Sequence, residues 1–384
     1  MLNVSGATAP RLVDRASGRL RALCVGAGLS AEADAVVATF AELVAPWGHE
    51  RVDPSSPWRS EISDDHTPVE FSAAIAGQRT EVRALFEPQA DEPTVRARRD
   101  AGLALHERLR RDYDADLARF KLLEELFLPD DMDGPFALWS SVVFTRGAAP
   151  AFKAYFNPQA RGRQNAPALV DEALRRLGMP RAMAALRASS LRRGPELDEL
   201  KYFALDLSAA PSARVKVYVR HHGATPQDLE AATARARRRT PGEALGFARA
   251  MRGGDGPLAV RAAASCSAFT AEVGDGGPDA TAVYVPVCAY AHDDGVASER
   301  LRAYMLSRSV DPSAYDRMLG AFANRPLWSG VGMQSWFSVR TADGAPRFAV
   351  YLATELRRVF QPGTVPAPST ACDPSPEFEH AESP

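Results

Sequence analysis

The feature that most limits the fold of this chain is a fivefold alternation of helical segments with pairs of short strands. Each strand pair forms a hairpin, with turns near residues 78, 148, 210, 276 and 343, a spacing of about 65 residues. Helical periodicity fills the segments between the hairpins, which gives helix-helix-strand-strand five times over. The predicted helical segments are 11–24, 31–45, 93–127, 166–177, 180–188, 226–238, 241–252, 296–307 and 312–323.

Five hairpins provide ten antiparallel strands, and closing them into a barrel removes exposed sheet edges. Side chains alone can fill an eight-stranded barrel, so ten strands leave room for a chamber. We therefore predict an α+β fold in which residues 1–360 form one antiparallel barrel with helices outside. Residues 361–384 are rich in proline, serine and acidic residues and are expected to be a disordered tail.

The second strand of each hairpin gathers its polar residues on one face. In ARVKVYVRHH (213–222), period-two alternation puts three valines on one side and Arg214, Lys216 and Tyr218 on the other. A single Lys-x-Tyr strand more often faces solvent, but repetition favours an interior face. Because unpaired buried cations are very costly, an anion such as a diphosphate is expected there. The sister strands supply Arg83, Lys153, Tyr155, Tyr284, Arg347 and Tyr351.

Several of these segments resemble a known family when taken in order. TPVEFS (67–72), KAYF (153–156), RVKVYV (214–219) and the VYL of the last strand resemble aromatic prenyltransferases of the dimethylallyltryptophan synthase type. Within that family the chain looks most like the bacterial indole prenyltransferases, and the resemblance spans about residues 10–358. The resemblance implies the ABBA barrel, whose five helix-helix-strand-strand units surround a chamber.

The resemblance also implies roles for residues that match the motifs of the family. Glu70 matches the glutamate that accepts the indole N–H hydrogen bond, and Trp336 falls where relatives have another aromatic residue. Arg347 is added to the diphosphate site on strand parity alone. The matching cations are Arg83, Lys153, Arg214 and Lys216, and the tyrosines that shield the allyl cation are Tyr155, Tyr218, Tyr284 and Tyr351.

Two departures from the family pattern bear on the site. Relatives that prenylate indole C4 carry a lysine just before the KAYF strand, whereas this chain has Arg146 there, so C4 attack is in doubt. Ala282 stands two residues before Tyr284 where a cation would complete the ring, which predicts a lopsided diphosphate site. Arg220 is expected to lie past the chamber. For Glu70 the plainer alternative is a rim glutamate paired with an arginine.

The implied reaction is electrophilic substitution, in which dimethylallyl diphosphate loses diphosphate and the allyl cation attacks the indole of tryptophan or a small tryptophan derivative. Alternatives within the class are a phenolic acceptor or a geranyl donor. An alternative from another class is a non-catalytic barrel that binds an isoprenoid phosphate. The aspartates in PDDMDGP (129–135) lack the spacing of a DDxxD magnesium motif, so no metal site and no Mg²⁺ requirement are predicted.

Composition limits the partners. A formal net charge of −2 gives no basic excess for nucleic acid or anionic membranes. No signal peptide or run of about 18 apolar residues is present. The cysteines Cys24, Cys266, Cys288 and Cys372 lack CxxC spacing, which suits a reducing cytoplasm. A cytoplasmic monomer or homodimer that binds only small molecules is therefore expected.

Overall fold

The computed structural model describes residues 10–52, 59–76, 79–132, 134–272, 276–342 and 345–366. The turns predicted near 78 and 343, Asp133, and the tail from residue 367 onward lie outside these ranges. Within them, ten antiparallel strands close into one barrel, in the order β1-β10-β9-β8-β7-β6-β5-β4-β3-β2. The strands are β1 (Val69–Ala76), β2 (Arg79–Phe86), β3 (Leu138–Thr145), β4 (Ala151–Phe156), β5 (Asp198–Asp206), β6 (Val215–His221), β7 (Ala263–Phe269), β8 (Ala280–Val285), β9 (Gln334–Ala342) and β10 (Ala345–Ala353).

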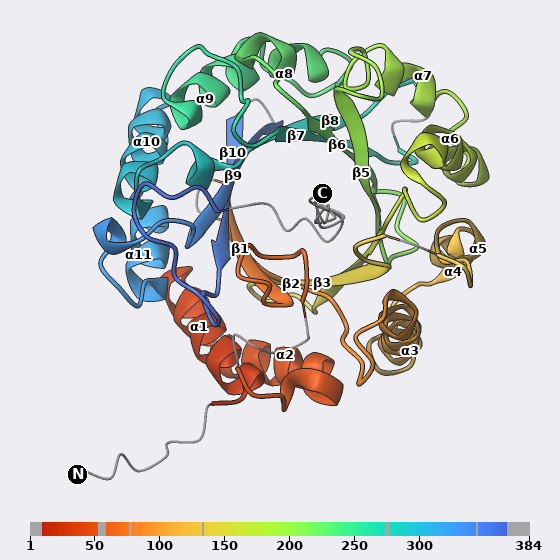
Figure 1. The fold of residues 1–384 in the computed structure, drawn as a ribbon, viewed down its shortest axis with the longest axis horizontal. Helices are drawn as coiled ribbons and strands as arrows, with labels where there is room; N and C mark the ends of the chain where they lie inside the picture. The colour runs from red at the N-terminus through yellow and green to blue at the C-terminus, as the bar shows by residue number, and fades with distance from the viewer. Residues whose placement is uncertain are drawn as a thin grey trace, which may run out of the picture.

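The helices form a ring around the barrel (Figure 1). In chain order two or three helices precede each strand pair, as the repeat predicts. They are α1 (Leu12–Gly26), α2 (Ala33–Gly48), α3 (Val95–Tyr113), α4 (Ala118–Lys121), α5 (Glu124–Phe127), α6 (Ala166–Arg176), α7 (Ala182–Arg187), α8 (Pro226–Ala232), α9 (Glu243–Arg252), α10 (Asp294–Ser307) and α11 (Ser313–Phe322). Short 3₁₀ turns occupy Arg163–Asn165, Val287–Ala289 and Leu327–Ser329.

Two helical segments differ from the sequence prediction for local reasons. The region 93–127 divides into α3, α4 and α5, because Asp114 adopts a left-handed conformation (φ 54°) and ends α3. The segment 226–238 is helical only to Ala232. Beyond it, the N–H groups of Arg237 and Arg238 donate to the carbonyl oxygens of Pro278 and Asp279, at 3.0 and 2.8 Å, and so run beside the start of β8.

The core lies between the barrel and the helix ring. Val215, Val217 and Val219 of β6 are 0% exposed, so the apolar face of this strand is covered and its Lys and Tyr face points inward. The ring closes where α1 meets α11. A methyl group on Gly26 would lie 2.7 Å from the carbonyl oxygen of Arg317, so only glycine allows this close approach.

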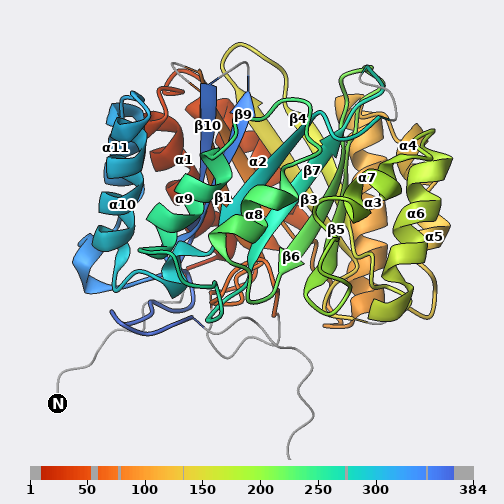
Figure 2. The same ribbon diagram turned by 90° about the horizontal axis from the view of Figure 1, so that it is seen from above.

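The two ends of the barrel differ. At one end, the hairpin end, the strands of each pair join in turns, at the top of Figure 2. At the other, the loop end, the strands connect to helices, and the chain leaving β10 passes there. Glu70 lies next to Leu85 and Ala353 near the loop end, whereas Arg347 of β10 lies beside Arg340 of β9 nearer the hairpin end.

Candidate active site

The side chains predicted for the site all line the interior of the barrel. Glu70, Tyr155, Tyr218 and Trp336 line a cavity toward the loop end. Lys153 lines a wider hollow at the hairpin end. Tyr284 and Tyr351 lie between and border both the loop-end cavity and a smaller one. That smaller cavity, of about 70 Å³, is lined by Arg83, Arg214, Lys216 and Arg347.

Arg340 also lines the small cavity, and the sequence prediction missed it. This residue lies on β9, the strand next to the Tyr284 strand. It therefore supplies a cation on the side that Ala282 leaves without one. The cation that is missing at Ala282 is thus supplied by the neighbouring strand. Burial and the nearby Arg347 lower the pKa of Arg340 to about 10.

Two carboxylates hold the arginines of this cluster. Glu81 accepts a hydrogen bond from Arg83 at 2.6 Å and also pairs with Arg347. Asp206 pairs with Arg214 through Nε at 2.7 Å. Burial would raise the pKa of Glu81, but the two guanidinium groups hold it well below its usual range. Arg83, Arg214 and Arg347 are thus fixed in position before any anion arrives.

Other donors of the cluster have no partner among the described residues. The Nε of Arg83 is buried without a hydrogen bond. Lys153 is 5% exposed, and burial followed by repulsion from Lys216 lowers its pKa well below the ordinary value. Burial and Arg214 lower the pKa of Lys216 to about 8. Burying such a set of cations costs free energy when no anion is bound, and this favours binding of an anion.

The four predicted tyrosines form a continuous arc inside the barrel. Ring centroids are 6.1 Å apart between Tyr155 and Tyr218, 6.0 Å between Tyr218 and Tyr284, and 5.8 Å between Tyr284 and Tyr351. Burial raises the pKa of each hydroxyl. The rings therefore stay neutral and can offer their faces to a carbocation.

Glu70 is buried at the far side of this arc from the cations. Its carboxylate accepts a hydrogen bond from the Ser335 hydroxyl at 2.7 Å, so its hydrogen-bond partner is a serine and not an arginine. Burial raises the pKa of Glu70 to about 8, although the Ser335 hydrogen bond works in the opposite direction. The ionised form of a carboxyl with this pKa is about half populated at pH 8, and this form can accept a proton or a hydrogen bond.

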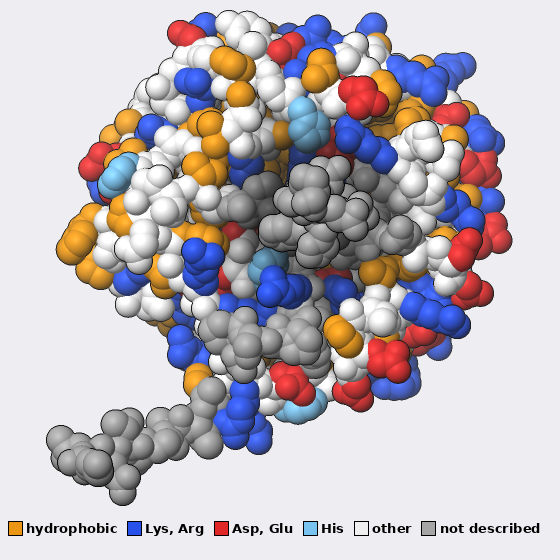
Figure 3. All heavy atoms as spheres, in the orientation of Figure 1, with side chains coloured by type: hydrophobic (Ala, Val, Ile, Leu, Met, Phe, Trp, Pro, Cys, Tyr) orange, Lys and Arg blue, Asp and Glu red, His pale blue; other side chains and the backbone are white. Residues whose placement is uncertain are grey.

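The loop-end cavity has a volume of about 150 Å³ and mixes aromatic rings with charges. Trp139, Tyr202 and Trp336 supply the rings. The Nζ of Lys201 lies 3.7 Å from a carboxylate oxygen of Glu61. The cavity is therefore suited to a flat ring that carries a polar group. In Figure 3, which views this end of the barrel, basic and acidic side chains lie intermixed on the face.

Two arginines complete this cavity. Arg220 lines it, so the expectation that Arg220 lies past the chamber was wrong. Arg261, which the sequence prediction did not include, forms two hydrogen bonds to Asp64 at 2.7 and 2.8 Å. Its guanidinium carbon lies 5.1 Å from the ring centroid of Trp336. Asp64 thus holds Arg261 against the ring that faces the cavity.

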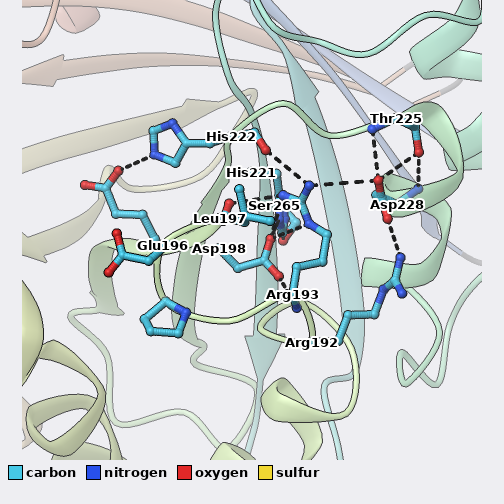
Figure 4. Close-up of polar contacts among 12 residues, drawn as sticks. Arg192, Arg193, Glu196, Leu197, Asp198, His221, His222, Thr225, Asp228 and Ser265 are labelled. Atoms are coloured by element: carbon cyan, nitrogen blue, oxygen red, sulfur yellow. Dashed lines mark hydrogen bonds and ion pairs between the residues drawn. The ribbon is translucent and has the colours of Figure 1, made fainter.

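A second polar cluster lies outside the chamber (Figure 4). The Nδ1 of His221 is 2.7 Å from Asp198, and its Nε2 is 2.8 Å from the Ser265 hydroxyl. This order of groups is that of a hydrolase triad. However, Ser265 is 0% exposed, and its neighbour across the ladder, Val219, belongs to the face covered by helices. The cluster therefore ties β5, β6 and β7 together.

No metal site is visible among the described residues, where no three His, Cys, Asp or Glu side chains are grouped to hold an ion. In the same part of the chain, no helix has the length and apolarity needed to cross a membrane.

The closed barrel, with a cation cluster facing an aromatic cavity across a tyrosine arc, defines the class of barrel prenyltransferases. Residues 30–318 match the family described as tryptophan dimethylallyltransferase. The chain belongs to this family and is a prenyltransferase, which confirms the resemblance and the ABBA barrel predicted from the sequence.

Solved structures of similar proteins agree. A 6-dimethylallyltryptophan synthase from Micromonospora olivasterospora, in complex with DMASPP and Trp, is 34% identical with a TM-score of 0.86, covering 92% of this chain and 100% of that one. A 5-dimethylallyltryptophan synthase from Streptomyces coelicolor is 31% identical with a TM-score of 0.84, covering 93% and 99%. PriB, in complex with L-tryptophan and dimethylallyl thiolodiphosphate, is 32% identical with a TM-score of 0.85, covering 93% and 100%.

Proposed function

We propose that this enzyme transfers the dimethylallyl group of dimethylallyl diphosphate to the indole ring of free L-tryptophan in specialised metabolism. The observation that carries the proposal is the layered chamber, with cations, tyrosines and a buried glutamate in succession. Family membership and the tryptophan complexes of similar proteins support it. They favour it over a non-catalytic barrel, because the family consists of transferases.

The position of the donor follows from the positive charge of the small cavity. The diphosphate lies among Arg83, Lys153, Arg214, Lys216, Arg340 and Arg347, so negative charge that develops as the allylic C–O bond breaks meets fixed cations. Removing one such preorganised donor typically costs about 3 kcal/mol of transition-state stabilisation. The allyl cation forms against Tyr155, Tyr218, Tyr284 and Tyr351, whose faces attract it and exclude water.

The acceptor site follows from the loop-end cavity. The indole lies among Trp139, Tyr202 and Trp336, with its N–H donating to Glu70. This hydrogen bond raises the electron density of the ring, and a C–C bond to the allyl carbon forms as the ring proton is lost to a base. Should nitrogen be the attacked atom, Glu70 is the group placed to take the N–H proton.

Free tryptophan fits this cavity better than a phenol or a tryptophan-derived cyclic dipeptide. A free amino acid carries one ammonium and one carboxylate. Glu61 can accept from the ammonium, while Lys201 and Arg220 can bind the carboxylate, and all three line the cavity. A phenol has no ammonium or carboxylate to bind these charges, so it would leave Arg220 without an anionic partner from the acceptor.

The finer expectations from the sequence belong to the same proposal. The enzyme needs no metal, because the cations of the site can neutralise the diphosphate themselves. It acts in the cytoplasm as a monomer or homodimer on small molecules alone. The free, buried state of Cys24, Cys266 and Cys288 is compatible with a reducing compartment.

Replacing Glu70 tests the proposal. Glu70→Gln keeps the size of the side chain but removes the charge, and we expect a loss of about 100-fold or more in kcat/KM for tryptophan. Binding of the unreactive analogue dimethylallyl thiolodiphosphate, measured by calorimetry, should change less than about twofold. Lys216→Met is the matched control, since it should weaken analogue binding. Full activity of the Gln variant would refute the role of Glu70.

A further inference from the structure

The cation cavity adjoins a wide hollow at the hairpin end of the barrel. This hollow, of about 1050 Å³, is bordered by the end of α3 and by the turns that follow β3 and β5. Rim residues such as Ala151, Ser208 and Ala210 are exposed. Arg214, Arg340 and Arg347 line both the cation cavity and the hollow. The anion site thus borders directly on a surface opening.

The route between the cation cavity and the loop end is lined by different groups. From the cation cavity toward the loop end, an anion would have to cross the arc of Tyr284 and Tyr351, which border both cavities. Beyond the arc it would meet the carboxyl of Glu70, and the cation Lys201 already has Glu61 beside it. Arg220 and Arg261 also line the loop-end cavity, the latter held by Asp64, but none of these cations lies between the rings of Tyr284 and Tyr351. Passing a diphosphate between those rings would strip its hydration at a point where no described cation replaces it.

The direction of the donor within the chamber agrees with an opening at the hairpin end. The diphosphate belongs among the cations, which adjoin this opening, and the allyl group belongs at the tyrosines, farther in. A donor that enters here travels tail first and stops with its charge beside Arg214 and Arg340. A donor entering from the loop end would have to carry its charged head past the acceptor cavity.

We propose that the chamber has two separate entrances: prenyl diphosphate enters and inorganic diphosphate leaves at the hairpin end, while the aromatic acceptor and its product use the loop end. This inference rests on the proposed function, because it takes the cation cluster as the diphosphate site. Two consequences follow. Donor and acceptor bind without a compulsory order, and diphosphate can leave while the acceptor site is occupied.

The test is the dissociation rate of radiolabelled diphosphate, chased with unlabelled diphosphate, with and without saturating tryptophan. With two entrances, the rate constant should change less than about twofold. A fall of tenfold or more with tryptophan present would show that the acceptor blocks the only exit and would overturn the proposal.

A blocked opening provides the complementary measurement. In a Cys372→Ser background, Ala210→Cys is labelled with a polymer-linked maleimide, since Cys24, Cys266 and Cys288 are buried. The label should slow diphosphate release and donor binding at least fivefold and leave the Kd for tryptophan within about twofold. The matched control is Leu306→Cys, at a position 61% exposed on the outer helix α10. Its label should change neither the rate of diphosphate release nor the rate of donor binding.

A wrong assignment of the cation cluster and a wrong assignment of the entrances give different experimental results. If diphosphate does not bind, or binds equally well to Lys216→Met, the assignment of the cation cluster is wrong and the entrance proposal falls with it. If the cluster binds diphosphate, but tryptophan traps it and the Ala210 label has no effect, only the entrance proposal is overturned.

Discussion

Binding of the prenyl diphosphate should draw protons from solution, because the empty site holds lysines that burial partly discharges. Lys216 has a pKa of about 8, lowered by burial and then by Arg214. The pKa of Lys153 is lowered well below its ordinary value by burial and by Lys216. An anion placed against these two groups favours their charged forms and raises both pKa values.

The expected size of the effect follows from these pKa values. At pH 8, Lys216 is about half protonated in the free enzyme, so full protonation in the complex takes up about 0.5 proton. Lys153 adds up to about one more, which gives a total of about 0.5 to 1.5 protons per site. At pH 6.5, Lys216 is already protonated, and its contribution falls below about 0.1 proton.

Calorimetry can measure this uptake. Dimethylallyl thiolodiphosphate is titrated at pH 8 and pH 6.5 in buffers of different ionisation enthalpy; its terminal phosphate is already ionised at pH 8. Lys216→Met should lower the uptake at pH 8 by about 0.5 proton. Arg347→Met should weaken binding without changing the uptake, since arginine does not deprotonate at this pH. No uptake at pH 8, or uptake unchanged in Lys216→Met, would refute the reasoning.

Other perturbations have equally definite outcomes. Since the pKa of Glu70 is raised to about 8, kcat/KM for tryptophan should rise about tenfold per pH unit and level off above about pH 8. Ser335→Ala removes the hydrogen bond that lowers this pKa and should move the pH profile of kcat/KM to higher pH. A profile that does not change with pH would contradict the role of the carboxylate. Tyr284→Phe should keep kcat within about threefold. Tyr284→Ala loses a cation–π contact of about 1–2 kcal/mol and should release more dimethylallyl alcohol per prenylated product. Equal alcohol yields from the two variants would contradict the role of Tyr284 in shielding the allyl cation from water. Gly26→Ala places a methyl group 2.7 Å from backbone atoms and should lower the free energy of unfolding in urea by about 1–3 kcal/mol. Gly18→Ala, with nothing within 4 Å of the added methyl group, should leave this free energy unchanged or raise it. A larger loss of stability in Gly18→Ala than in Gly26→Ala would refute the packing argument.

The barrel and most of its lining could be predicted from the sequence because period-two alternation determines which side of a strand each residue faces. Residues such as Lys216 and Tyr218 are two apart on one strand and therefore share a face. Arg340 could have been found in the same way, since it lies four residues after Trp336. It was missed because its cation stands on the first strand of a hairpin and not on the second.

The rest of the site depends on features that alternation does not reveal. The strand register shifts between Leu200 and Tyr202, and this places Lys201 as well as Tyr202 on the cavity wall. A second shift, between Tyr351 and Leu352, accompanies the inward position of Ser335. Such bulges redirect side chains next to functional sites, and their positions depend on strand pairing.

Loop residues were equally inaccessible to sequence reasoning. Glu61 and Asp64 precede β1 in an irregular segment, and Arg261 precedes β7. Asp64 and Arg261 are 197 residues apart in the chain, so only closure of the barrel brings them together.

The most direct test of the central claim is to incubate the purified enzyme with dimethylallyl diphosphate and L-tryptophan in the presence of EDTA, and to identify the product by mass spectrometry and NMR. We predict a tryptophan that carries one dimethylallyl group on the indole, formed together with an equal amount of diphosphate. Prenylation of a phenol but not of tryptophan by the enzyme, or activity only after Mg²⁺ is restored, would contradict the account.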